Sequence, residues 1–249
     1  MNKLIFDIGN TYIKGCYGNG NIHGVQRSFY SKNELRKYFK AFLGKFSKNP
    51  GSVYIITQNS YLIPSLKKII YEKFGDIRVE KPEIDFEYPL KVSYSKTLGY
   101  DRYYAAAGAY FKFNAYRNIL VIDMGTATTF NLLSDGVFKG GMISPGVPAA
   151  AGIISGITTL PEIKFKKEIN LINSDTKNAI NSGILFQQKY FIEKSVASYR
   201  KINKGLLCII TGGGYKYLTN NIEGIDVYEK NLVLEGINFI INWKYAGKK

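Results

Sequence analysis

The chain has 249 residues, 45% of them hydrophobic, and its 34 lysine and arginine residues against 19 aspartate and glutamate residues give a net charge of +15 at pH 7. Such a chain can bury a sizeable core, and no stretch of the sequence reaches the roughly 18 consecutive apolar residues of a membrane-spanning helix. The single histidine, His23, and the two cysteines in apolar segments, Cys16 and Cys208, argue against a Ser-His triad, a multi-histidine metal site and a disulfide framework.

The excess of positive charge raises the question of an anionic partner. The lysines are scattered, with acidic residues among several of them, in segments such as SLKKIIYEKFG and KFKKE, and the sequence has no zinc-finger spacing or single-strand-binding motif. We therefore expect no specific binding of nucleic acid, although a basic surface favours a phosphate-bearing ligand. The N-terminal residues carry no signal-peptide pattern, so we expect a cytoplasmic protein without a membrane partner.

The first half of the chain is predicted to begin with two strands joined by a turn, in KLIFDIGNTYIKGCY (3–17). A buried strand, a polar turn and a helical segment follow in SVYIITQNSYLIPSLKKIIYEKFG (52–75), and a short strand is expected in DIRVEKP (76–82). The last element predicted here is a helix in DRYYAAAGAYFKF (101–113), with Asp101 as its N-cap. Because a helix N-terminus stabilises negative charge, we expect the ionised form of Asp101 to be favoured.

The second half repeats this series of elements in the same order. It contains a strand, a D-x-G turn and a strand in NILVIDMGTATTFNLL (118–133), a strand, a glycine turn and a helical segment in LLCIITGGGYKYLTNNIEG (206–224), a short strand in IDVYEKN (225–231) and a helix in LVLEGINFIINWKYA (232–246). The repetition indicates an internal duplication. We predict two similar α/β lobes, residues 1–115 and 116–249, each a mixed sheet covered by helices, which face a central cleft that binds the ligand.

The two D-x-G turns have the residues of a phosphate-binding turn. Glycine lets backbone N–H groups approach an anion closely, and the Asp7 carboxylate can face phosphate through a hard cation such as Mg²⁺. Asn10 and Thr11 can donate hydrogen bonds to phosphate oxygens, and Lys14 adds a positive charge. The second turn offers the same groups, in Asp123, Gly125, Thr126 and Thr129. Each turn alone is more typical of an ordinary hairpin than of a ligand site, but the recurrence of both turns in a matching series of elements favours a ligand site.

The two-lobed organisation resembles the superfamily of actin, sugar kinases and chaperone ATPases, whose lobes have a ribonuclease H-like fold. Within it, a series of motifs resembles the type III pantothenate kinase family in sequence and in order. These motifs, which span most of the chain, are DIGNTYIK, LGYDR, DMGTATT, GGMISPG, TTLP, TKNAINSG, TGGGYKYL and NLVLEGI. Each motif is weak by itself, whereas the ordered set is specific.

The resemblance implies a homodimeric enzyme that transfers the γ-phosphate of ATP to the primary hydroxyl of pantothenate, the first step of coenzyme A synthesis. It implies Mg²⁺ or another divalent cation at Asp7, and potassium or ammonium as a monovalent cation at Asp123. Asp101 would accept the proton of the substrate hydroxyl. The nucleotide-binding residues implied are Asp7, Ile8, Gly9, Asn10, Thr11, Lys14 and Thr126. The pantothenate-binding residues implied are Tyr94, Gly99, Tyr100, Asp101, Arg102 and Thr176.

Two positions depart from the pattern of the family. The segment SKTLGYDR after Tyr94 is shorter than in most members and lacks a proline, and Asn131 stands where the family commonly has an aspartate. Arg102 is suited to clamp a substrate carboxylate, or is a surface charge on the first turn of a helix.

Two other functions remain open as alternatives. The first is a non-catalytic nucleotide-binding regulator, of the kind described as an accessory factor for transcription. The second is an actin-like ATPase that hydrolyses ATP without an acceptor. The carboxylates of Asp7, Asp101 and Asp123 argue against a regulator, and the short chain argues against an ATPase with inserted subdomains.

Overall fold

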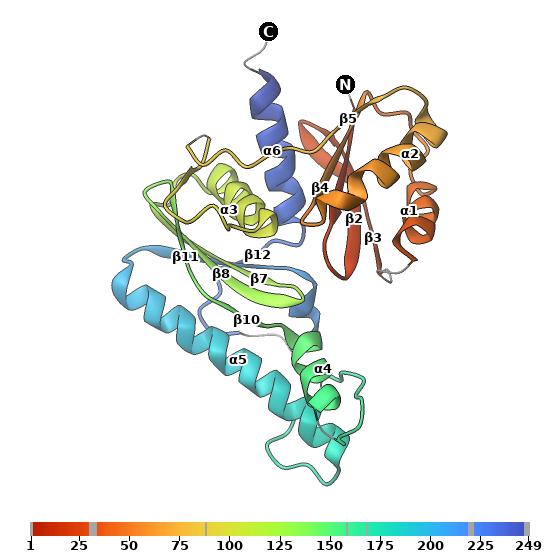
Figure 1. Ribbon diagram of the computed structural model, residues 1–249. Helices are drawn as coiled ribbons and strands as arrows, with labels where there is room; N and C mark the ends of the chain where they lie inside the picture. Colours follow the sequence, from red (N-terminus) through yellow and green to blue (C-terminus); the bar gives the residue numbers. More distant parts are fainter. Residues whose placement is uncertain are drawn as a thin grey trace. The chain divides into compact units, whose positions relative to one another are not determined.

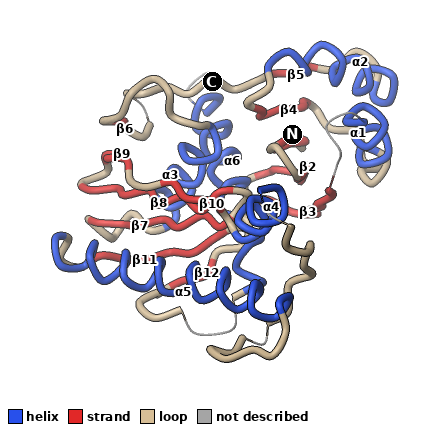
Figure 2. The backbone as a smooth tube through the Cα atoms, turned by 60° about the horizontal axis from the view of Figure 1, so that its bottom comes forward, coloured by secondary structure: helices blue, strands red, loops and turns tan. Residues whose placement is uncertain are grey.

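The computed structural model describes residues 2–29, 34–87, 89–157, 159–167, 169–218 and 222–246. The chain folds into two compact units: unit 1 comprises Met1–Leu90, Ser95–Phe111 and Leu232–Lys249, and unit 2 comprises Lys91–Tyr94 and Lys112–Asn231. Each unit is a β-sheet with helices packed on it (Figures 1 and 2). Among the described helices, none combines the length and the apolar character needed to cross a bilayer.

The sheet of unit 1 is mixed. Its strands are β1 (Lys3–Ile8), β2 (Tyr12–Asn19), β3 (Asn21–Phe29), β4 (Ser52–Thr57) and β5 (Arg78–Glu80). Their order across the sheet is β3-β2-β1-β4-β5. Strand β2 is antiparallel to both of its neighbours, β1 and β3, whereas β1, β4 and β5 run parallel to one another. Strands β1 and β4 therefore end at the same edge of the sheet.

The sheet of unit 2 repeats this arrangement. Its strands are β6 (Lys91–Val92), β7 (Asn118–Met124), β8 (Ala127–Ser134), β9 (Val137–Gly140), β10 (Ile143–Pro145), β11 (Leu206–Thr211) and β12 (Val227–Tyr228). The strands β9-β8-β7-β11-β12 have the order and directions of β3-β2-β1-β4-β5, with β6 added beside β9 and β10 paired with β8. The prediction of two similar mixed α/β halves is therefore confirmed.

The helices of unit 1 cover both faces of its sheet (Figure 1). They are α1 (Leu35–Leu43), the 3-10 helix η2 (Ser60–Leu62), α2 (Ile63–Phe74), α3 (Tyr100–Lys112) and α6 (Leu232–Ala246). The sequence predicted α2, α3 and α6 but not α1. The C-terminal helix α6 packs on β1, β2 and β3, so the units divide the chain differently from the expected boundary between residues 115 and 116.

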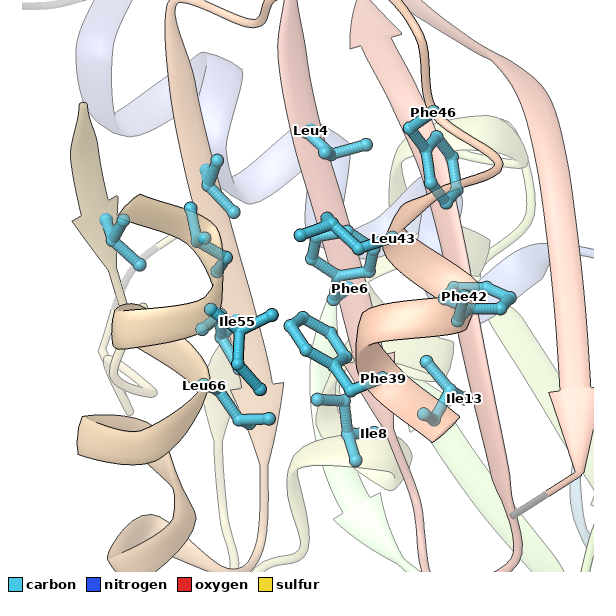
Figure 3. Packing of buried hydrophobic residues seen from close by; sticks show 14 of the residues in the cluster. Leu4, Phe6, Ile8, Ile13, Phe39, Phe42, Leu43, Phe46, Ile55 and Leu66 are labelled. Atoms are coloured by element: carbon cyan, nitrogen blue, oxygen red, sulfur yellow. The ribbon is translucent and has the colours of Figure 1, made fainter. Parts of the chain in front are cut away.

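The hydrophobic core of unit 1 fixes which way each residue of β1 faces (Figure 3). Leu4, Phe6 and Ile8 are buried against α1 and α2, and the Phe6 ring meets the Phe39 ring edge-on with centroids 5.1 Å apart. Because successive side chains of a strand point to opposite faces, Asp7 lies on the other face of the sheet. That face is the one covered by α6.

Close packing between α3 and α6 holds the start of α3 in place. Gly108 of α3 and Gly236 of α6 face each other, since a Cβ at Gly236 would be 2.8 Å from the Gly108 nitrogen. Larger residues there would force the two helices apart. The packing therefore fixes the helix whose first turn carries Asp101.

The helices of unit 2 are α4 (Val147–Ile157), α5 (Thr176–Ile202) and the 3-10 helix η3 (Gly213–Tyr217). The long helix α5 runs along the sheet (Figure 2). Its residues Leu185 and Ile192 belong to the hydrophobic core of unit 2. Neither α4 nor α5 was predicted. The helical segment expected after β11 is only the 3-10 helix η3 in the described residues, because consecutive glycines disfavour an α-helix; residues 219–221 lie outside them.

Candidate active site

The turn between β1 and β2 brings together the phosphate-binding residues predicted in the first half. The Gly9 N–H donates across the turn to a carbonyl at 3.0 Å, which leaves Asn10 exposed and Thr11 half-buried. Asp7 is paired in register with Lys14 of β2, and Lys14 Nζ lies 3.4 Å from Asp7 Oδ2. A carboxylate and an ammonium group therefore stand side by side next to the turn.

The oxygen ligands at this turn suit a divalent cation that arrives with a nucleotide. In the part of the chain that the structure describes, no three histidine, cysteine, aspartate or glutamate residues are grouped as metal ligands. The Ile8 side chain belongs to the core, so only its backbone can contribute. Mg²⁺ is often held by one carboxylate, water and substrate phosphates, and Asp7 fits this pattern better than that of a resident all-protein metal site.

Asp101 lies in the first turn of α3, one position after the helix begins at Tyr100. The Tyr103 N–H donates to the Gly99 carbonyl at 3.1 Å, which is the first bond of the helix. The expectation that Asp101 itself is the cap is therefore wrong, because Gly99 occupies that place. Asp101 Oδ1 instead accepts the N–H of Arg102 at 2.9 Å.

The pKa of the Asp101 carboxyl is raised above its ordinary value, chiefly because surrounding protein atoms desolvate the carboxylate. Asp101 as a residue is nevertheless exposed, so water still reaches it. The N–H of Arg102 lowers the pKa, and the negative charge of Asp7 raises it further. The expected lowering of this pKa by the helix N-terminus is therefore not found, since desolvation outweighs the donors at the helix start. A raised pKa makes Asp101 a stronger proton acceptor than an ordinary aspartate.

Gly99 keeps the space beside the Asp101 carboxylate open. A Cβ at this position would be 2.7 Å from Asp101 Oδ1 and 3.1 Å from Gln58 Nε2. The Gln58 amide therefore borders the same space as the candidate proton acceptor. Sequence reasoning missed Gln58; the available signal was its place directly after β4, which ends at the same sheet edge as β1.

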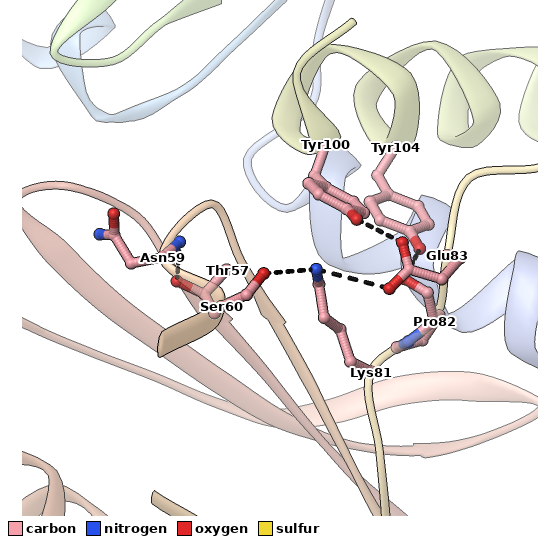
Figure 4. Close-up of polar contacts among 8 residues, drawn as sticks. All are labelled: Thr57, Asn59, Ser60, Lys81, Pro82, Glu83, Tyr100 and Tyr104. Atoms are coloured by element: carbon pink, nitrogen blue, oxygen red, sulfur yellow. Dashed lines mark hydrogen bonds and ion pairs between the residues drawn. The ribbon is translucent and has the colours of Figure 1, made fainter. Parts of the chain in front are cut away.

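A polar network anchors Tyr100 next to Asp101 (Figure 4). The Tyr100 hydroxyl donates to Glu83 Oε2 at 2.6 Å, and Lys81 lies 3.4 Å from Glu83 and 4.8 Å from the centre of the Tyr100 ring. Lys81 also donates to Ser60 Oγ at 2.9 Å. Burial, followed by the hydrogen bond to Glu83, raises the pKa of Tyr100. The network ties the start of α3 to η2 and to the segment after β5.

Arg102 is buried, with 5% of its surface exposed. The alternative that it is a surface charge on the first turn of a helix is therefore wrong. Arginines are rarely buried unless their charge is paired, so burial at this position indicates that the charge of Arg102 has a specific role. Its role as a clamp for a substrate carboxylate stays a prediction.

The turn between β7 and β8 in unit 2 has the same construction as the first turn. Asp123 is paired with Thr129 across the two strands, and the Gly125 N–H donates across the turn at 2.9 Å, leaving Thr126 exposed. Gly212, with φ of 90°, follows β11 and lies against Asp123. A Cβ at Gly212 would overlap both the Asp123 carboxylate and the Met124 carbonyl, so these two oxygens border one space.

Asn131, which departs from the family pattern, supports this second turn from within the sheet. It is fully buried, and its Nδ2 donates to Thr129 Oγ1 at 3.0 Å. Thr129 is in turn the partner of Asp123. A neutral amide therefore stands where an aspartate would add a second negative charge.

The residues predicted to bind pantothenate are distributed over both units. Gly99, Tyr100 and Arg102 belong to unit 1, whereas Tyr94 and Thr176 belong to unit 2. The Tyr94 ring is 38% exposed and packs beside β9. Thr176 is the exposed first residue of α5, after an aspartate cap that accepts a backbone N–H at 2.9 Å.

Sequence comparison identifies relatives of the whole chain. The family model for type III pantothenate kinase matches residues 3–198. A type III pantothenate kinase of Azobacteroides pseudotrichonymphae is 30% identical over 242 residues, which cover 96% of this chain and 95% of the relative. A type III pantothenate kinase of Bifidobacterium longum is 30% identical over 247 residues, covering 94% and 96%.

Solved structures share the fold at lower identity. A Campylobacter jejuni protein described as a Baf family transcriptional activator has a TM-score of 0.62 at 21% identity, covering 98% of this chain and 99% of its own. An inorganic polyphosphate/ATP-glucomannokinase from Arthrobacter has a TM-score of 0.50 at 15% identity, covering 98% and 99%. These likenesses concern the fold alone, and they confirm the predicted α/β fold class.

Proposed function

The chain belongs to the type III pantothenate kinase family, and from this premise we propose which of its residues carry out the reaction. The enzyme transfers the γ-phosphate of ATP to the primary hydroxyl of pantothenate, which gives 4'-phosphopantothenate and ADP. The observation that carries the proposal is the pair of carboxylates in unit 1. Burial raises the pKa of Asp101, and the negative charge of Asp7 beside the phosphate-binding turn raises it further.

Asp101 accepts the proton of the attacking hydroxyl. The hydroxyl oxygen forms a bond to the γ-phosphorus while the bond from that phosphorus to the bridging oxygen of ADP breaks, and the proton passes to a carboxylate oxygen of Asp101. Phosphoryl transfer has a loose transition state, so the proton can leave late and a carboxylate is a sufficient base. The Arg102 N–H, which donates to Asp101 Oδ1 at 2.9 Å, holds the carboxylate in position.

The turn between β1 and β2 holds the phosphates of the nucleotide. Asn10 and Thr11 donate hydrogen bonds to phosphate oxygens, and Gly9 lets the backbone approach them. Asp7 holds the divalent cation, and Lys14 adds a positive charge beside it. A divalent cation, when bound, neutralises charge on the phosphate oxygens.

Pantothenate is recognised at its carboxylate and beside its reactive hydroxyl. Arg102 matches a carboxylate with two parallel N–H groups, and Gly99 leaves room for the hydroxyl next to Asp101. Tyr100, held by Glu83, lines the same turn of α3. The family resemblance also assigns substrate contacts to Tyr94 and Thr176 and a nucleotide contact to Thr126.

Potassium or ammonium is expected to increase the activity measured in sodium or Tris buffer. The carboxylate of Asp123 and the carbonyl of Met124 border the space over Gly212, and a weakly hydrated cation suits such mixed oxygen ligands. The measurement is the initial rate in Tris buffer at constant ionic strength with each chloride salt in turn. Equal rates in all buffers would remove Asp123 from the metal-binding residues.

We further propose that the enzyme is a homodimer. Two apolar side chains in unit 2 support this, because Leu171 is 82% exposed and Ile172 is 92% exposed, and large exposed apolar groups mark interaction surfaces. Light scattering after size-exclusion chromatography should give twice the chain mass of 28.1 kDa. A species with the mass of one chain at micromolar concentration would contradict the dimer.

The proposed function is tested by ADP release in the presence and absence of pantothenate. A kinase releases ADP only when the acceptor is present. Release that does not depend on pantothenate would indicate the ATPase alternative. ATP binding without release under either condition would indicate the regulator.

A further inference from the structure

A row of charged side chains crosses the first sheet beside the β1–β2 turn. Asp7 is paired with Lys14, and Lys14 is paired with Arg27 of β3. Directly paired residues of neighbouring strands share a face of the sheet, and such strands are about 4.8 Å apart. All three side chains therefore start from the face opposite the core of Phe6 and Ile8.

The Arg27 side chain does not extend over Lys14, its partner in the strand register, but reaches toward the β1–β2 turn. Its guanidinium carbon lies 3.8 Å from the centre of the Tyr12 ring, two residues closer to the turn than Lys14. The Phe29 ring meets the Tyr12 ring edge-on at 5.9 Å and steadies it. A guanidinium stacked on a ring keeps its N–H groups directed outward in its own plane, where they can reach an anion.

Lys14 and Arg27 differ in whether an acidic side chain balances their charge. Lys14 lies 3.4 Å from the Asp7 carboxylate, so its charge is already partly balanced. The Arg27 side chain is exposed and, within the described ranges, forms no ion pair and no hydrogen bond. The guanidinium lies over the aromatic face of Tyr12, which leaves its N–H donors available. Arg27 is therefore a cation with unused donors next to a phosphate-binding turn.

We propose that Arg27 donates hydrogen bonds to the terminal phosphates of the nucleoside triphosphate that the β1–β2 turn holds. The inference rests on the proposed function, because it takes the phosphate donor to bind at this turn. Asp7 brings a negative charge toward a polyphosphate, and Lys14 offsets only that charge. Arg27 supplies a positive charge to balance the triphosphate. Its contact with the Tyr12 ring holds the guanidinium in position before the nucleotide binds.

The test compares Arg27→Ala with Arg36→Ala. Arg36 is an exposed arginine of α1, which packs on the opposite face of the sheet, so both variants lose the same charge from unit 1. Arg27→Ala should raise the KM for MgATP about tenfold and leave the KM for pantothenate unchanged, as expected for one lost charge-assisted contact. Arg36→Ala should behave like the parent, and Arg27→Lys should fall between, because lysine keeps the charge but not the planar fork.

Calorimetric binding of a non-hydrolysable ATP analogue and of AMP separates this inference from the function on which it rests. Arg27→Ala should bind the triphosphate analogue more weakly than Arg36→Ala does, with AMP binding equal in both. Equal binding of the analogue by the two variants would overturn the inference, as would an equal loss for AMP. A parent enzyme that binds the analogue but shows no pantothenate-dependent ADP release would instead overturn the function.

Discussion

Replacing Asp101 with asparagine is expected to reduce the pantothenate-dependent kcat by a factor on the order of 10² or more, because a positioned proton acceptor is lost. Asparagine has nearly the same size, and its side-chain oxygen can still accept the Arg102 N–H that donates at 2.9 Å. The helix should therefore form as before, and the β1–β2 turn should still bind MgATP. Rates, MgATP affinity and the melting temperature are measured together.

Asp76→Asn is the matched control for this change. Asp76 is an exposed aspartate of unit 1 between α2 and β5, so the variant loses the same charge away from the first turn of α3. If Asp101→Asn turns over like Asp76→Asn, the carboxylate of Asp101 takes no proton. If Asp101→Asn loses MgATP binding or unfolds, the proposed separation between nucleotide binding and proton transfer is wrong.

Replacing Asp7 with asparagine is expected to weaken the binding of MgATP by at least about tenfold and to reduce turnover as well. The change removes a carboxylate ligand for the divalent cation and leaves Lys14 without the partner that lies 3.4 Å from it. Titration with ATP at low and at saturating Mg²⁺ separates the two contributions. The dependence on Mg²⁺ should be lost in Asp7→Asn and kept in Asp101→Asn. Unchanged dependence in Asp7→Asn would remove this residue from the cation site.

The duplication was the part of the fold that the sequence could predict. A strand, a D-x-G turn and a second strand leave a recognisable pattern at Asp7 and again at Asp123, because alternating burial and turn chemistry are local properties. Pairing the equivalent strands then gives the same order in both sheets. The helix α1 was also within reach, since Leu35, Phe39 and Phe42 have the spacing of an amphipathic helix.

Contacts between elements that are far apart in the chain could not be predicted from the sequence. The C-terminal helix α6 follows the strands of unit 2 but packs on β1, β2 and β3, through a close approach between Gly108 and Gly236. Lys91 and Val92 likewise pair with β9 although they precede α3 in the chain. Such contacts depend on surfaces that exist only after the local elements have formed.

The candidate site shows the same division between local and distant effects. The pairing of Asp7 with Lys14 follows from the spacing of two strands around a short turn, and these two residues are paired in the structure. The raised pKa of Asp101 depends on desolvation and on Asp7, which is far away in the sequence. Gln58 and Arg27 could be identified as site residues only from the register of strands β4 and β3 with their neighbours.

The pH dependence of pantothenate-dependent turnover tests the central role of Asp101 most directly. Only the ionised carboxylate accepts a proton, and its pKa is raised from the ordinary aspartate value. Turnover of the parent should therefore be constant near neutral pH and fall as the pH decreases through this raised pKa, with MgATP and pantothenate both saturating. Asp101→Asn should show a low rate without that acidic decline. An acidic decline of the same midpoint in the variant would show that another group accepts the proton, and would contradict the account.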